Sequence, residues 1–223
     1  MIPRAHYIHE LGEVQRALLQ LGEAVQRALV HAMGALARGD LAAARRIIRE
    51  DDDIDERRAA VEERALHLIA AQQPFATDLR FLLAALRIAD DLERIGDYAE
   101  GIAALVLRSA DEPTLELPHE LNLLTAQVQQ MLKLSVAAVV ERDSSAIDDL
   151  RRADDLADEL NRTIRAAMLR RIQSTPHQAT RALYFLFVAH NLERIADRAV
   201  NIAERTAFIV TGAQPKLGEA RDS

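Results

Sequence analysis

Two pairs of carboxylates, each one helical turn apart, are the residues of this chain best suited by type and spacing to do chemistry. Glu93 and Asp97 recur as Glu193 and Asp197, within a 13-residue segment that is identical at eight positions after an offset of 100 residues. Residues four apart share one helix face, and such like charges cost about 0.2–0.5 kcal/mol per pair on an exposed helix. A cation is the first candidate to compensate them.

A second acidic pair accompanies the first in each half. Asp51 and Asp55 match Asp154 and Asp158 at an offset of 103 residues, and on a helical wheel they fall in the arc of their helix that also holds apolar residues. They are therefore expected to face a neighbouring helix. The candidate metal ligands are Asp51, Asp55, Glu93 and Asp97 in the first half and Asp154, Asp158, Glu193 and Asp197 in the second.

Two interpretations of these acids remain open at this stage. A site of oxygen donors without thiolates suits Mg, Ca, Mn or Fe, with Zn possible. Alternatively, nearby arginines such as Arg94, Arg194 and Arg198 satisfy the carboxylates through salt bridges. His190 precedes the second motif where Asp90 precedes the first, and it is a weaker candidate ligand.

Composition excludes several other functions. The chain has no cysteine, so disulfides and thiolate zinc sites are not available. Its net charge of −7 makes nucleic acid an unlikely partner. It contains no phosphate-binding loop, nucleophile elbow or His-Glu-x-x-His motif. No secretory signal or membrane span is expected, because the markedly apolar stretch 182–192 is about half of the ~20 residues that a span needs; a cytoplasmic protein is predicted.

The elements that position the carboxylates are all predicted to be helices. The mix of Ala, Leu, Arg, Glu and Asp with 4% aromatic residues is typical of an all-α protein. Short connections make consecutive helices antiparallel, so the fold class is a tandem repeat of two three-helix up-down bundles. The helices are expected at about 4–38, from Asp40 to 72, from Pro74 to 108, and at 119–142, 144–173 and 177–211.

The repeat also predicts how the chain divides. The first bundle should occupy residues 1–110 and the second residues 119–212, with 111–118 as a proline-containing linker. Residues 213–223 are expected to form a mobile tail after Gly212.

Several motifs resemble the PhoU family of phosphate-transport accessory and regulatory proteins. They are Glu93-Arg-Ile-Gly-Asp97, Glu193-Arg-Ile-Ala-Asp197, Asn201-Ile-Ala-Glu-Arg205, Val210-Thr-Gly212 and Gln73-Pro-Phe-Ala-Thr-Asp-Leu-Arg80. The resemblance covers about residues 4 to 212 and keeps the order of the motifs.

This resemblance carries expectations beyond what the residues alone indicate. It implies two three-helix bundles, often dimeric, whose Glu/Asp-x-x-x-Asp motifs bind multinuclear iron or zinc clusters in some members; Mg, Mn or Ni are alternatives. It also implies a negative regulator of phosphate uptake and of the phosphate-starvation response. Such a regulator contacts the ATPase subunit of a phosphate ABC transporter and a membrane sensor histidine kinase, and reaches the membrane only through these partners.

Departures between the repeats predict that the two sites are unequal. Gly101 and Ala104 stand where the second repeat has Asn201 and Glu204, so the first site is expected to be poorer in ligands. The rival functions are a carboxylate-bridged metalloenzyme, such as a ferritin-like di-iron oxidase, and a metal-free helical scaffold. The oxidase is disfavoured because ferritin-like sites use Glu-x-x-His, whereas Gly96 and Ala196 occupy that histidine position.

Overall fold

The computed structural model describes residues 4–213 and consists of long helices in this range. The helices are α1 (Arg4–Arg38), α2 (Leu41–Gln72), α3 (Ala76–Arg108), α4 (His119–Glu141), α5 (Ala146–Ser174) and α6 (Ala179–Thr211), with a short 3-10 turn, η1 (Pro176–Gln178), before α6. The predicted all-α fold is confirmed, and the helix bounds agree with the sequence-based ones to within about two residues.

Capping residues explain where helices begin and end. The Asp40 carboxylate accepts a 2.9 Å hydrogen bond from the Ala43 backbone N–H and caps α2. Gly212 closes α6 in the left-handed conformation, with φ 73°. Asp143 does not cap α5 as Asp40 caps α2; instead it accepts a bond from the Ser145 backbone N–H at 2.8 Å, and α5 begins later than predicted. The sixth helix begins after η1 and not at His177.

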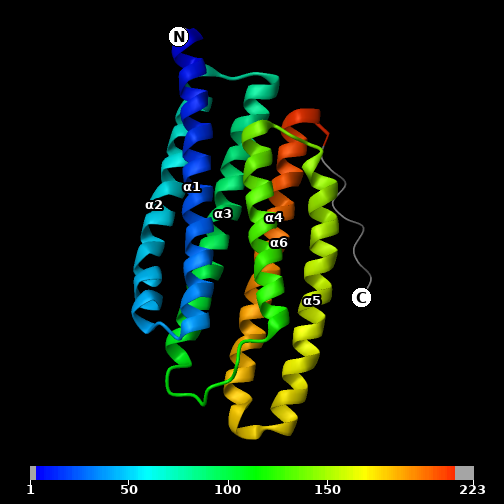
Figure 1. Ribbon diagram of the computed structural model, residues 1–223. Helices are drawn as coiled ribbons and strands as arrows, with labels where there is room; N and C mark the ends of the chain where they lie inside the picture. Colours follow the sequence, from blue (N-terminus) through cyan, green and yellow to red (C-terminus); the bar gives the residue numbers. More distant parts are fainter. Residues whose placement is uncertain (1–3, 214–223) are drawn as a thin grey trace.

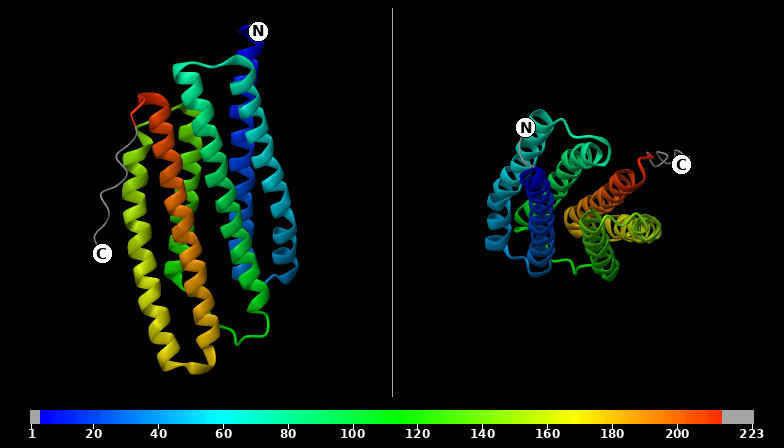
Figure 2. Two further views of the ribbon diagram at one scale, coloured as in Figure 1. Left: turned by 180° about the vertical axis from the view of Figure 1, so that it is seen from behind. Right: turned by 90° about the horizontal axis from the view of Figure 1, so that it is seen from above.

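The helices form two three-helix bundles that lie side by side in an elongated molecule (Figures 1 and 2). Helices α1 to α3 make one bundle and α4 to α6 the other, and successive helices run antiparallel. Residues 109–118 connect α3 to α4 without helical structure. The predicted tail lies outside the described residues apart from Ala213.

The bundles meet along two pairs of helices. Helix α3 packs against α6, and α1 packs against α4. At the second contact Gly22 allows close approach, because a Cβ atom there would come within 2.9 Å of the Val136 side chain. Near one end of the α3 and α6 pair, Arg181 on α6 donates a 2.6 Å hydrogen bond to the Ser109 carbonyl, which follows α3. A single buried core, rich in Leu, Ile, Val and Ala, therefore runs through both bundles.

Helix α4 is a candidate membrane span that the sequence analysis overlooked. By length and composition alone His119–Glu141 could cross a membrane. Half of its most apolar stretch is buried in the protein, where Leu121, Leu124, Val128 and Met131 are fully covered. Core packing accounts for this apolar character.

Candidate functional site

The first bundle brings its four predicted carboxylates together across α2 and α3. Asp51 and Glu93 are half-buried, and Asp55 and Asp97 are exposed. The negative charges of Asp55, Glu93 and Asp97 each raise the pKa of Asp51, so the four groups share one electrostatic environment. The helix faces assigned from the sequence are thus the ones that meet.

Glu100 is a fifth member of this group that sequence reasoning missed. Its negative charge raises the pKa of Asp51 more than the charge of any other carboxylate does. The signal was its spacing, because Glu100 follows Glu93 by seven residues and Asp97 by three, which places all three on one face of α3. The expectation that the first site is poorer in acidic ligands therefore has to be corrected; Val200 stands at the equivalent position of the second repeat.

Burial and mutual repulsion perturb this acidic cluster, which we define as Asp51, Asp55, Glu93, Asp97 and Glu100. Burial, followed by the neighbouring carboxylates, raises the pKa of Asp51 to about 6. The pKa values of Glu93, Asp97 and Glu100 are also raised, in each case first by burial and then by neighbouring acids. Arg94 lowers the pKa values of Glu93 and Asp97 without reversing these shifts.

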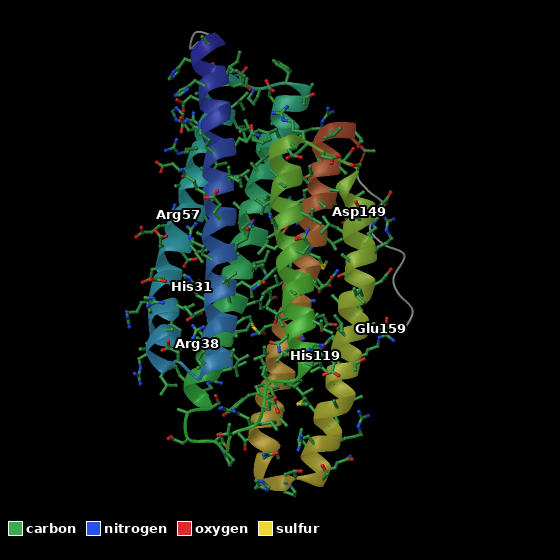
Figure 3. The ribbon with its side chains drawn as sticks, viewed as in Figure 1. His31, Arg38, Arg57, His119, Asp149 and Glu159 are labelled. Atoms are coloured by element: carbon green, nitrogen blue, oxygen red, sulfur yellow. The ribbon has the colours of Figure 1, made fainter. Side chains whose placement is uncertain are left out.

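Among the described residues, Arg58 and Arg94 lie near enough to lower the pKa of Glu93, but neither pairs directly with a member of the acidic cluster. Within the described residues, none of its members forms an ion pair with an arginine, lysine or histidine. Neighbouring acids on α2 do have partners: Arg57 pairs with Asp53 at 2.8 Å, and Arg58 pairs with Glu62. Figure 3 shows Arg57 on the side of α2 away from α1.

A hollow beside the cluster opens toward α1. It has a volume of about 410 Å³, and its lining includes Asp51 and Glu100 together with Arg27 and His31 of α1. Gly96 lines it as well, and a Cβ atom there would lie 3.0 Å from Ile54 and 3.3 Å from the Asp51 carboxylate. The absence of a side chain on α3 thus lets α2 approach and holds Asp51 against the cluster.

Two of the equivalent acids in the second bundle have basic neighbours. Asp154, Asp158, Glu193 and Asp197 are all half-buried on α5 and α6. Arg194 forms a 2.8 Å ion pair with Asp197, and His190 lies 3.6 Å from Glu193. Burial raises the pKa of Asp197, while Arg194 and then Arg198 act to lower it; Glu193 and Asp158 add to the rise.

Further acids of the second bundle are also paired or point outward. Glu204, the residue expected to enrich this site, is 3.2 Å from Arg151 of α5. Asp149 and Glu159 are exposed on α5 (Figure 3). The salt-bridge interpretation therefore describes Asp197 and Glu204 in the second bundle, but not the acidic cluster of the first.

The donor chemistry of the first cluster suits a hard or borderline cation, since it gathers five carboxylates on two adjacent helices and the pKa values of Asp51, Glu93, Asp97 and Glu100 are raised. Its side chains are not yet converged, because within residues 4–213 no three histidine, aspartate or glutamate groups are placed to hold a metal ion. The residue types and helix placement fit a metal, whereas the side-chain rotamers have to change to bind it.

Comparison with known proteins gives a consistent result over nearly the whole chain. The family model of the PhoU domain matches residues 18–106 and again residues 121–206. A phosphate-specific transport system accessory protein PhoU homolog of Clostridium acetobutylicum is 34% identical over 94% of this chain and 96% of its own length. The homolog of Rhizobium meliloti is 31% identical over 96% of this chain and 90% of its own length.

Solved structures agree with the sequence relatives. The phosphate transport system regulatory protein PhoU of Streptococcus pneumoniae superposes with a TM-score of 0.88 at 27% identity, covering 95% of this chain and 100% of that one. PhoU of Pseudomonas aeruginosa gives a TM-score of 0.88 at 28% identity, covering 93% and 100% respectively.

Proposed function

The chain belongs to the PhoU family, and from this premise we propose that it restrains phosphate uptake and the phosphate-starvation response by binding other proteins. The observation that carries the proposal is the match of both bundles, over nearly their whole length, to accessory proteins of phosphate transport. The chain acts as an accessory protein of such a system and not as an enzyme.

The proposed partners are the ATPase subunit of a phosphate ABC transporter and a membrane sensor histidine kinase. Both present surfaces in the cytoplasm, so we place this protein there, as a homodimer that contacts the membrane only through them. The elongated double bundle offers long helical faces for such contacts (Figure 2), and the net charge of −7 favours basic partner surfaces. Contacts of this kind weaken as salt screens them.

We also propose that the carboxylates of both bundles bind metal ions. We assign the ligands to Asp51, Asp55, Glu93 and Asp97 in the first bundle, joined by Glu100, and to Asp154, Asp158, Glu193 and Asp197 in the second. Iron or zinc is favoured, with Mg, Mn or Ni as alternatives. A bound cation supplies positive charge that neutralises the carboxylates. The side chains themselves link α2 to α3, and α5 to α6, when they turn toward a common ligand.

The regulatory proposal is tested in cells that carry an affinity-tagged copy. Capture from cells grown in high phosphate should recover the transporter ATPase and the sensor kinase, and less of both from starved cells. Deletion should raise starvation-gene expression and phosphate accumulation in high phosphate. Unchanged uptake and gene expression after deletion, combined with turnover of ferrous iron by the pure protein, would instead support the oxidase.

A further inference from the structure

A buried carboxylate joins the two bundles at the centre of the molecule. Asp91 on α3 is only 3% exposed. Arg198 of α6 donates a 3.2 Å hydrogen bond through Nη1 to its Oδ1, and Arg205 of α6 donates a 2.7 Å bond through Nε to its Oδ2. We call Asp91, Arg198 and Arg205 the clasp. None of the three is among the candidate metal ligands.

The same contact occurs a second time without a buried ion pair. Helices α3 and α6 are antiparallel (Figure 2) and carry equivalent residues 100 positions apart. A contact from residue 91 to residue 198 therefore has a counterpart from residue 191 to residue 98. There Asn191 donates to the Tyr98 carbonyl at 3.5 Å. Leu105, the counterpart of Arg205, is buried.

Apolar burial cannot tell the two repeats apart in this region. Leu92, Ile95, Ala99, Ile102 and Ala103 are buried on α3, and Leu192, Ile195, Ala199, Ile202 and Ala203, which are identical in type, are buried on α6. Along α3 and α6, a first repeat could bury nearly the same apolar surface against another copy's first repeat as against its own second repeat. Another feature has to select the correct pairing.

We propose that the clasp is this selector: it makes the first repeat pack on the second and opposes the packing of like repeats from two copies. Two α3 helices packed in the observed geometry would place Asp91 against Tyr98 and Leu105, with no cation at the positions that Arg198 and Arg205 occupy in the native contact. Two α6 helices would place Arg198 and Arg205 against Asn191, with no carboxylate. A charge buried without its partner is strongly unfavourable, which penalises the α3 pairing through Asp91. The α6 pairing gathers the arginines without a carboxylate; their side chains are 18% and 30% exposed, so its penalty is smaller.

Selection is a better account than added stability. A buried ion pair often contributes no more to stability than well-packed apolar residues, yet leaving one of its members alone is costly. Buried polar groups that set the register and number of strands in coiled coils act in this way. The counterpart around Asn191 shows that the same helix contact packs without a buried ion pair.

Two symmetrised versions of the full-length protein separate selection from stability. The neutral version places the residue types of the Asn191 contact at both contacts. The charged version places the residue types of the clasp at both. In each version, pairing of like repeats is no longer penalised. The neutral version is Asp91→Asn, Arg198→Tyr and Arg205→Leu; the charged version is Asn191→Asp, Tyr98→Arg and Leu105→Arg. Leu21→Ala, a buried core residue of α1 that is not part of the clasp, controls for simple destabilisation.

The measurement detects exchange of repeats between copies. Two differently tagged copies of one version are unfolded together and refolded at high concentration, and a second sample contains the same copies mixed after folding. Both samples are diluted and held long enough for the subunits of an ordinary homodimer to exchange, and each is then captured through both tags in turn; the copies mixed after folding give the background. Excess capture after joint refolding reports repeat-swapped assemblies. We expect little excess for the wild type and the Leu21→Ala control, and a several-fold larger excess for both symmetrised versions.

The charged version decides the question, because it keeps every ion pair and removes only the selection. Excess capture of the charged version supports the proposal. If the charged version shows no excess, the proposal is overturned even if the neutral version swaps, because the clasp would then only add stability. If the charged version does not refold, the neutral one decides: swapping above the Leu21→Ala control supports the proposal, and swapping at the level of that control overturns it.

Discussion

The two bundles hold equivalent acids in different electrostatic environments. In the first, burial and neighbouring carboxylates raise the pKa values of Asp51, Glu93, Asp97 and Glu100, and none of these acids forms an ion pair with a described cation. In the second, Arg194 pairs with Asp197 and Arg151 pairs with Glu204. A duplicated motif thus yields one site that still requires positive charge and one site that already has much of it.

The difference originates outside the Glu-x-x-x-Asp motif itself. Gly96 lets Ile54 and Asp51 approach α3, and Glu100 extends the acidic face by a turn, whereas the second repeat has Ala196 and Val200 at these positions. We therefore expect a cation to act mainly on the first bundle, and the following predictions test this asymmetry.

The largest expected effect is stabilisation by metal. A cation that binds only the folded chain adds about 2.7 kcal/mol at a hundredfold excess over its Kd, or a rise in Tm of roughly 5–10 °C at this chain length. Asp51→Asn with Asp97→Asn should remove most of this rise, and Asp158→Asn with Asp197→Asn should remove much less. Calorimetry of metal-free protein with added zinc, manganese or ferrous iron measures it. Equal losses in the two double variants would contradict the asymmetry.

A smaller effect is expected in the absence of metal. Asp51→Asn removes several like-charge contacts worth about 0.2–0.5 kcal/mol each, so it should raise the free energy of unfolding by about 1 kcal/mol at neutral pH. Urea unfolding of chelator-treated protein measures the change. Asp53→Asn is the matched control, because it removes the ion pair with Arg57 and should not stabilise. Destabilisation by Asp51→Asn would show that this carboxylate has a cationic partner.

The gain from Asp51→Asn should also depend on pH. Folding raises the pKa of Asp51 from 3.8 to about 6, so the folded chain holds the proton more tightly than the unfolded chain. The contribution of Asp51 to stability is therefore fully present below about pH 4 and is lost as the pH rises through about 6. The variant's advantage should be near its full value at about pH 7 and shrink toward about pH 4; an advantage independent of pH would exclude this cause.

The smallest effect concerns the second bundle. Arg194→Gln removes the ion pair with Asp197, which is partly exposed and worth about 0.2–1 kcal/mol. It should raise the pKa of Asp197 further and make this site more responsive to added metal. Arg94→Gln, at the equivalent position of the first repeat, is the control; Arg94 has no ion pair within the described residues, and its loss should change metal-free stability less.

The sequence was sufficient for the helices because their signals are local. Asp40, Pro74 and Gly212 mark helix ends by rules that need no tertiary structure, and the apolar periodicity assigned Asp51 to the helix face that meets α3. Comparison of the two repeats does not reveal Glu100, because Glu100 has no acidic counterpart in the second repeat. Whether a carboxylate forms an ion pair with an arginine depends on side-chain rotamers and on how closely the helices approach. A helical wheel contains neither kind of information.

A pH titration of side-chain carboxyl resonances in metal-free protein measures whether the carboxylates of the first bundle lack a compensating cation, as they do among the described residues. Asp51→Asn and Asp197→Asn assign the two signals. We expect a midpoint for Asp51 at about pH 6, above that of Asp197, and a fall in this midpoint when metal is added. An Asp51 midpoint near 3.8, its ordinary value, that metal does not shift would show that the carboxylate is already compensated.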